Sequence, residues 1–243
     1  MKPLFRRING AIVVLLLAAV FAPQVPPHDE GAVYAAGAGT LPELTITEIL
    51  ANSNGDGTSI ADAYEYVELK NNSNRPIDLA DYKFTFWWRP DRYVVWDMTA
   101  SQTIAPGEIR VVWIKNQDAQ GKTLQHFNAH YGTNFTASTL YILDIGYNGG
   151  LGNDGIKKLI LMKDDGTEVC IAQYNDRIFD SLTNNEDARV ENSSIVYEFP
   201  HYPVPGNITM RMIDSNQKPT PGTIPEPPSI WITEIMVNSS SPV

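Results

Sequence analysis

Apolar and polar residues alternate in short segments along most of the chain. Residues 44–50 read Leu-Thr-Ile-Thr-Glu-Ile-Leu, a segment rich in threonine and isoleucine that begins with strict alternation. A period of two predicts a β-strand with one face toward a core. Similar segments predict eight further strands, at residues 64–69, 77–88, 92–96, 109–115, 140–145, 157–162, 168–174 and 194–199.

Turn signals separate the predicted strands. Residues 71–76 read Asn-Asn-Ser-Asn-Arg-Pro, Ala-Pro-Gly occupies 105–107, and Asp-Asp-Gly at 164–166 is typical of a hairpin turn. A helix is predicted only at residues 123–131. Many short strands with frequent turns predict an all-β protein, a sandwich or a barrel, with one short helical insert.

The first residues have the pattern of an export signal. Three basic residues, Lys2, Arg6 and Arg7, precede twelve apolar residues at 11–22. A bilayer span needs about 20 residues, so the pattern predicts a signal peptide over residues 1–38. An uncleaved anchor is the alternative. Both predict a secreted or cell-surface protein, and cleavage would leave no membrane span.

A proline-rich stretch and a repeat suggest the domain organisation. Residues 214–229 contain five prolines, which predicts a linker after a domain at 43–213. Ile-Thr-Glu-Ile and Asn-Ser of residues 44–53 then recur at the same offsets in 230–239. We therefore expect residues 230–243 to begin a second, truncated copy of the domain, which makes the chain the N-terminal part of a longer protein.

Four segments carry a resemblance to a known family: Ile46–Ile49, Glu65–Asn71, Pro76–Lys83 and Ile104–Val112 resemble the lamin tail domain. The similarity is good over residues 43–115 and looser over 139–200, and residues 127–133 look like an insert of secreted bacterial members. The resemblance implies an immunoglobulin-like β-sandwich.

The resemblance also implies a role in attachment or recognition. In secreted bacterial proteins such modules often precede calcineurin-like phosphoesterase or nuclease domains. We therefore expect a non-catalytic module whose partners are downstream domains and an extracellular or cell-wall ligand. Two alternatives remain: the N-terminal fragment of a secreted metallophosphoesterase or nuclease, and a carbohydrate-binding module.

Composition and motifs argue against several classes of function. Lys and Arg total 18 against 28 Asp and Glu, a net charge of −10, which gives no strong nucleic-acid signal. The single cysteine, Cys170, excludes an intramolecular disulfide and a cysteine-based zinc cluster. No nucleophile–His–Asp order or acidic dyad stands out, so no catalytic residue and no required cofactor are predicted for this chain.

Aromatic residues provide the candidate ligand site. Four of the five tryptophans lie within residues 87–113. Alternation sends Trp87 and Trp88 to opposite faces of one strand. Exposed rings stack on sugars and other flat apolar ligands, whereas core filling is the competing interpretation. The candidates are Trp87, Trp88, Tyr93 and Trp96.

Acidic and amide residues provide the remaining candidates. Alternation places Glu48 on the same face as Leu44, Ile46 and Leu50. Buried there, it would accept hydrogen bonds from loop N–H groups, or ligate a metal with Asp62 or Glu65. The structural acidic residues are Glu48, Glu65 and Glu68.

A short loop raises calcium as a candidate cofactor. Asn52, Asn54 and Asp56 resemble the start of a calcium loop, although Ala63 stands where the last ligand belongs; the competing interpretation is a polar turn. His126 and His130 share a helical face, but the pattern lacks the glutamate of a zinc-protease motif.

Overall fold

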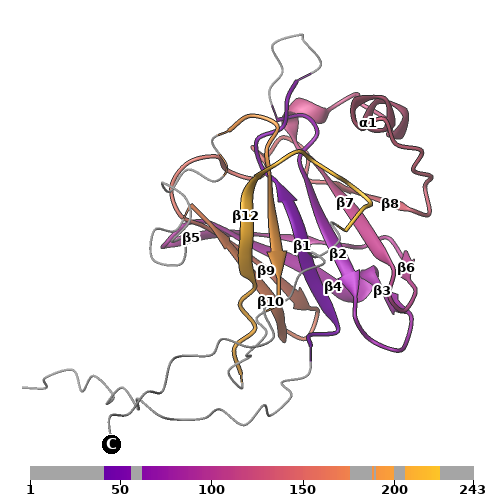
Figure 1. Cartoon of the computed structure of the whole chain (residues 1–243), viewed down its shortest axis with the longest axis vertical. Helices are drawn as coiled ribbons and strands as arrows, with labels where there is room; N and C mark the ends of the chain where they lie inside the picture. The colour runs from indigo at the N-terminus through magenta and orange to yellow at the C-terminus, as the bar shows by residue number, and fades with distance from the viewer. Residues whose placement is uncertain (1–40, 56–61, 176–187, 189, 200–205, 225–243) are drawn as a thin grey trace, which may run out of the picture. The chain divides into compact units, whose positions relative to one another are not determined.

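We describe the protein from a computed structural model (Figure 1). The chain divides into residues 1–37 and residues 38–243. The structure describes residues 41–55, 62–175, 188, 190–199 and 206–224. The expected signal peptide, Asp56 and the expected second copy lie outside these ranges.

The described chain is built from short strands with one α-helix. The strands are β1 (Leu44–Leu50), β2 (Tyr66–Asn71), β3 (Ile77–Asp78), β4 (Tyr82–Arg89), β5 (Arg92–Asp97), β6 (Thr103–Ile104), β7 (Ile109–Lys115), β8 (Leu140–Asp144), β9 (Lys157–Lys163), β10 (Glu168–Tyr174), β11 (Ser194–Glu198) and β12 (Arg211–Gln217). The helices are α1 (Leu124–Tyr131) and two 3₁₀ turns, η1 (Leu79–Asp81) and η2 (Gln117–Ala119).

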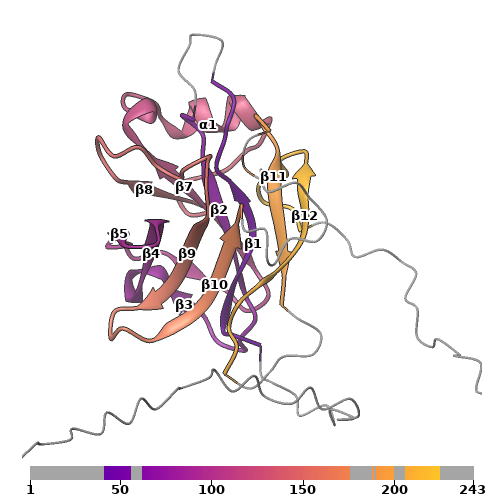
Figure 2. The same cartoon turned by 90° about the vertical axis from the view of Figure 1, so that its left-hand side faces the viewer.

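The strands form two main sheets that face each other (Figure 2). One has six strands in the order β12-β11-β1-β2-β7-β8, and the other has four in the order β10-β9-β4-β5. β3 and β6 make a separate pair. All of these pairs are antiparallel except β7 with β8. A parallel pair needs a crossover connection, and the segment that contains α1 supplies it.

Apolar side chains fill the space between the sheets. This main core includes Ile46, Leu69 and Val112 from the six-stranded sheet and Phe84 and Leu161 from the four-stranded sheet. A second cluster lies on the outer face of the six-stranded sheet, where Phe127 of α1 packs against Tyr66 and Trp113. The helical insert therefore covers one outer face of the sandwich.

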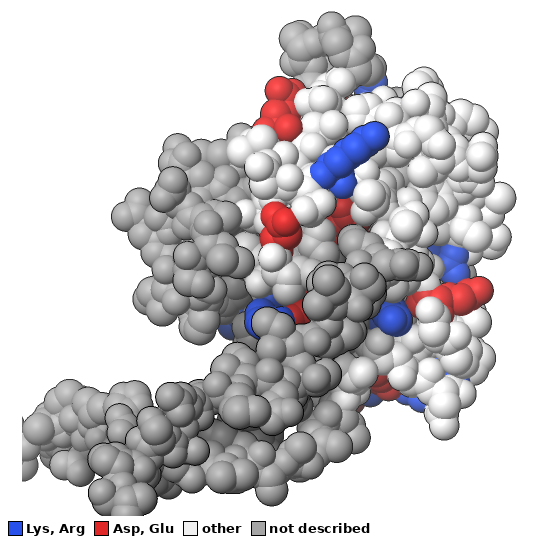
Figure 3. Space-filling view, in the orientation of Figure 1, with Lys and Arg blue, Asp and Glu red and all other residues white. Residues whose placement is uncertain are grey.

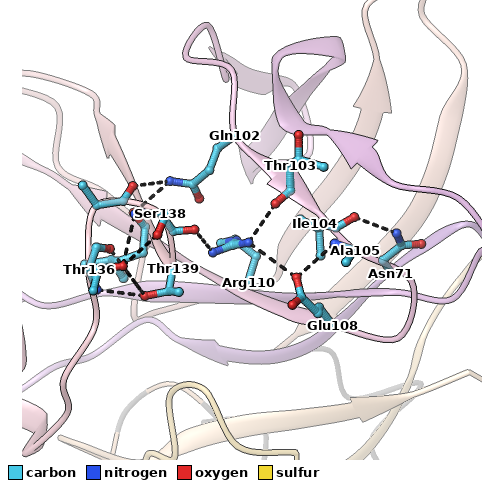
Figure 4. Close-up of polar contacts among 12 residues, drawn as sticks. Asn71, Gln102, Thr103, Ile104, Ala105, Glu108, Arg110, Thr136, Ser138 and Thr139 are labelled. Atoms are coloured by element: carbon cyan, nitrogen blue, oxygen red, sulfur yellow. Dashed lines mark hydrogen bonds and ion pairs between the residues drawn. The ribbon is translucent and has the colours of Figure 1, made fainter.

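A buried arginine ties the loop before β8 to the sandwich (Figure 4). The guanidinium of Arg110 donates to the carbonyl oxygens of Ser138 and Thr103 and lies 3.9 Å from Glu108. Burial lowers the pKa of Arg110, and Glu108 partly opposes this. Because a carbonyl oxygen of the loop before β8 and one of β6 share one cation, Arg110 ties that loop to the short β3–β6 pair.

The largest differences between the predicted strands and the structure are an interruption of one strand and an extra strand at the C-terminal side. Residues 77–88 do not form one strand, because η1 interrupts it after β3, with the Asp78 side chain accepting the Ala80 N–H. β12 has no counterpart among the predicted strands, and it carries the sandwich beyond residue 213. The predicted helix and the hairpin turn at 164–166 are both present.

The expected linker at 214–229 begins inside the folded domain. Residues 214–217 belong to β12, which pairs with β11. The next residues, 218–224, lie against the outer face of the six-stranded sheet, with Pro219 and Pro221 buried. We call residues 218–224 the C-terminal strap. Residues 225–229 lie outside the described ranges.

Candidate functional site

An aromatic pair lies on the outer face of the four-stranded sheet. Trp87 of β4 stands opposite Tyr93 of β5, with ring centroids 4.8 Å apart and planes 35° apart. Tyr93 is 55% exposed and Trp87 is partly exposed. Two adjacent rings on one sheet surface can together contact one face of a flat apolar ligand.

Neighbouring side chains extend this surface. Trp87 also stands opposite Lys158 of β9, and in the next row Thr85 stands opposite Val95, which is 45% exposed. Directly opposed residues share a face of a sheet. We call Trp87, Tyr93, Val95 and Lys158 the aromatic face. It combines apolar area with one cation.

The other two aromatic candidates do not join the aromatic face. Trp96 is 6% exposed and stacks on Phe86, with centroids 5.3 Å apart, so it fills the main core. Trp88 packs against that core, and the guanidinium groups of Arg89 and Arg92 lie 5.0 and 5.7 Å from its ring centroid. Only one ring of the Trp87–Trp88 dipeptide therefore pairs with Tyr93.

Glu48 lies on a different face from the one expected. The pairing of β1 with β2 shifts between Ile46 and Glu48, so that Thr47 and Glu48 together oppose Glu68. This β-bulge breaks the strict alternation. Ile46 faces the main core, whereas Glu48 shares the outer side with Leu50 and opposes Glu68.

The C-terminal strap binds both of these carboxylates. The Thr220 N–H donates to Glu48 Oε1 at 3.1 Å, and the Gly222 N–H donates to Glu68 Oε2 at 2.8 Å. The Thr47 hydroxyl donates to Glu68 Oε1 at 2.7 Å. The two glutamates therefore accept hydrogen bonds from the backbone of a distant segment.

Burial changes the ionisation of this pair. Burial and the charge of Glu48 raise the pKa of Glu68, the Thr47 and Gly222 hydrogen bonds lower it, and the net pKa is about 7. Burial likewise raises the pKa of Glu48, and the Ser194, Tyr66 and Thr220 groups oppose the rise. Because two ionised carboxylates would repel each other in a buried site, Glu48 and Glu68 together tend to retain at least one proton.

Glu65 lies apart from that pair, just before β2. It is fully buried, and its Oε2 accepts from Asn116 Nδ2 at 2.9 Å and from the Leu151 N–H at 3.0 Å. Burial raises its pKa well above the usual range, and the charges of Asp62 and Asp118 add to the rise. Glu65 shares no hydrogen-bond partner with Glu48 among those described.

The structure tests the expected metal-binding patterns only in part. Asp56 of the loop with Asn52 and Asn54 is outside the described ranges. His126 Nδ1 contacts the Thr123 hydroxyl in a capping box, whereas the His130 ring stacks on Tyr64 at 4.0 Å. No group of three or more His, Cys, Asp or Glu side chains in the described segments is arranged to hold a metal.

Cys170 lies in the core of the sandwich. Burial raises the pKa of its thiol to about 12. A thiol of that kind is a poor nucleophile and a poor metal ligand at neutral pH.

Among the described residues, no helix is long and apolar enough to cross a membrane.

The fold and its outer surfaces are those of an immunoglobulin-like β-sandwich with one helical insert. The family model of the lamin tail domain matches residues 38–176, more than half of the chain. The chain therefore belongs to the lamin tail domain family, as its strand motifs indicated. This domain is an immunoglobulin-like module and is generally non-catalytic.

A relative comes from Bacillus subtilis strain 168. It is the uncharacterized protein YvnB, which is 28% identical over 196 residues, 79% of this chain. The chain spans only 14% of the length of that relative. The matched region is thus a small part of a much longer bacterial protein.

Sequence reasoning missed the strap and its partners. The only signal is the glutamate of Ile-Thr-Glu-Ile, an acidic residue inside an apolar strand. That pattern indicates a buried carboxylate in need of donors, but it does not indicate that residues 172 positions away along the chain supply them.

Proposed function

We propose that this chain is an exported, non-catalytic lamin tail module that attaches a longer protein to an extracellular or cell-wall ligand. The observation that carries the proposal is the Trp87–Tyr93 pair, which leaves one ring more than half exposed on an open sheet face. Export rests on the basic and apolar pattern of residues 1–38.

Polysaccharide is the ligand class that the aromatic face suits best. The apolar faces of sugar rings pack on aromatic side chains, and Lys158 adds a donor beside Trp87. Lys and Arg do not form a broad basic surface on the face in Figure 3, where acidic and basic side chains are scattered. The net charge of −10 likewise disfavours a polyanionic ligand.

A titration with soluble oligosaccharides tests the ligand class. We expect a bound sugar to change the fluorescence of Trp87, and Trp87→Phe to remove most of that change while keeping a flat ring. Tyr147→Ala removes another exposed tyrosine, which is 85% exposed in the loop after β8, and should not alter binding. An unchanged titration for Trp87→Phe would place the ligand elsewhere.

We also propose that the module is the N-terminal part of a multidomain protein. Two observations support this. The chain covers only 14% of the Bacillus relative, and the Ile-Thr-Glu-Ile segment is repeated from residue 232. Reading the gene beyond the codon for Val243 tests it. A second sandwich followed by His- and Asp-rich phosphoesterase or nuclease motifs would place an enzyme downstream, and an immediate stop codon would remove the hydrolase alternative.

A further inference from the structure

We propose that Asp62, Glu65 and Asn153 form a Ca²⁺ site at one end of the sandwich. Asp62 and Glu65 lie in the segment before β2, and Asn153 lies in the glycine-rich loop between β8 and β9. This site is distinct from the Asn52, Asn54 and Asp56 pattern, and it does not depend on the aromatic face.

Hydrogen bonds hold the three side chains close together. Asn116 Nδ2 donates to the Asp62 carbonyl oxygen at 2.8 Å and to Glu65 Oε2 at 2.9 Å, so one nitrogen joins the two acidic residues. Asn153 Nδ2 donates to Asp62 Oδ2 at 3.1 Å, and the Leu151 N–H donates to Glu65 Oε2. The glycine-rich loop therefore contacts both carboxylates within three residues.

The loop approaches Glu65 so closely that it allows no side chain at Gly150. A Cβ atom there would lie 1.9 Å from Glu65 Oε2. The glycine lets the backbone wrap around the carboxylate. Glu65 is therefore held in one place, between the Asp62 segment and the loop.

Each of the three side chains has an oxygen without a donor. Asp62 Oδ1, Glu65 Oε1 and Asn153 Oδ1 are all buried and accept no hydrogen bond. Buried acceptors are normally satisfied, because an unmade hydrogen bond costs about 1–3 kcal/mol. The two carboxylate oxygens, Asp62 Oδ1 and Glu65 Oε1, are accounted for together if they share a cation.

The negative charge around Asp62 and Glu65 also favours a bound cation. The charges of Asp62 and Asp118 bear on Glu65, and those of Asp118 and Glu191 bear on Asp62. No lysine or arginine in the described segments forms an ion pair with either residue. Carboxylate and amide oxygens without a balancing positive charge are the ligands that Ca²⁺ takes at 2.3–2.6 Å.

Two carboxylates and an amide suffice for Ca²⁺ because backbone carbonyls and water complete its shell of six to eight oxygens. Mg²⁺ requires a smaller octahedral site and loses water reluctantly, so it should bind more weakly. In the structure Asn153 presents its Nδ2 to Asp62 Oδ2. Turning the amide by half a revolution brings its oxygen to the ion instead, since the two ends of an amide differ little in shape.

Thermal unfolding of the chelator-treated chain, with CaCl2 or MgCl2 added, tests the site. We expect Ca²⁺ to raise Tm by roughly 5–10 °C when its free concentration is about 100 times Kd. Mg²⁺ at the same concentration should raise it less. Calorimetric titration with CaCl2 should give one site per chain.

Two substitutions at the site have opposite expected effects. Asp62→Asn tolerates the positive φ of 65° at this position and should lose at least tenfold in Ca²⁺ affinity, with Tm in chelator unchanged or higher. Asn153→Asp adds a charge, so it should lower Tm in chelator and enlarge the rise that Ca²⁺ produces. Asn54→Ala is the matched control and should respond as the unsubstituted chain does.

The proposal fails if CaCl2 leaves the Tm of the unsubstituted chain unchanged at millimolar concentration. It also fails if Asn54→Ala abolishes the Ca²⁺ response while Asp62→Asn preserves it, since the metal would then bind to the Asn52–Asn54 segment. If Asp62→Asn does not fold, the Ca²⁺-induced rise in Tm of Asn153→Asp still tests the site: a larger rise supports it, and an unchanged or smaller rise contradicts it.

Discussion

Replacing Gly150 with alanine is expected to lower the free energy of unfolding by about 3 kcal/mol. Gly150 has a φ of 75°, a conformation that costs other residues roughly 1–2 kcal/mol. A Cβ would also lie 1.9 Å from Glu65 Oε2 and 2.7 Å from Asn116 Nδ2. Glu65 is fully buried, so displacing it breaks its hydrogen bonds as well. Urea denaturation measures the change.

Gly149→Ala provides the control one residue earlier. A Cβ at Gly149 would meet no atom within 4 Å, and its φ is outside the left-handed region. We expect the free energy of unfolding of this variant to stay within about 0.5 kcal/mol of the unsubstituted chain. Equal losses for the two variants would contradict the close packing of the glycine-rich loop on Glu65.

The second large effect concerns the pH dependence of stability through Glu68. Its pKa is about 7 in the folded chain, above the 4.5 of an unperturbed glutamate. A raised pKa means that the folded state holds the proton more tightly, so this contribution is fully present below about pH 4.5 and is lost as the pH rises through 7. Over that window Glu68 alone should lower the free energy of unfolding by at most about 3 kcal/mol.

Glu68→Gln isolates this contribution. The variant loses one acceptor oxygen, which costs about 1 kcal/mol at low pH. Between pH 5 and 8, however, it should lose less stability than the unsubstituted chain, so the two curves converge or cross. Glu168→Gln removes a charge at an exposed position of β10 and serves as the control. Parallel curves for Glu68→Gln and the unsubstituted chain would show that Glu68 stays ionised in the fold.

Much of the sandwich could be predicted from the sequence because its strands are short and bounded by turns. Residues 44–50, 109–115 and 168–174 have the predicted bounds. Alternation nevertheless misplaced Glu48, because a bulge depends on how two strands pair. β12 escaped prediction since its sequence, Arg-Met-Ile-Asp-Ser-Asn-Gln, is mostly polar and lies at a sheet edge.

The candidate sites were predictable only in part. Clustered tryptophans indicated an aromatic surface, but the pattern could not separate Trp87 from Trp96, since both occur in alternating strands and only packing decides which ring is buried. The proline-rich stretch was predicted to be a linker, because its composition does not show that distant carboxylates can accept hydrogen bonds from its backbone. The strap docks there because Glu48 and Glu68 present oxygens to the Thr220 and Gly222 amides.

Co-sedimentation with insoluble polysaccharides and bacterial cell-wall material tests most directly whether this lamin tail module is a binding module. We expect the purified chain to sediment with at least one of them. We expect the double variant Trp87→Ala/Tyr93→Ala, with an unchanged Tm, to bind about tenfold more weakly, since two lost stacking contacts are worth about 1.4 kcal/mol or more. Tyr147→Ala should bind normally. Equal binding by the double variant, or no binding by the unsubstituted chain to any of these materials, would contradict the account.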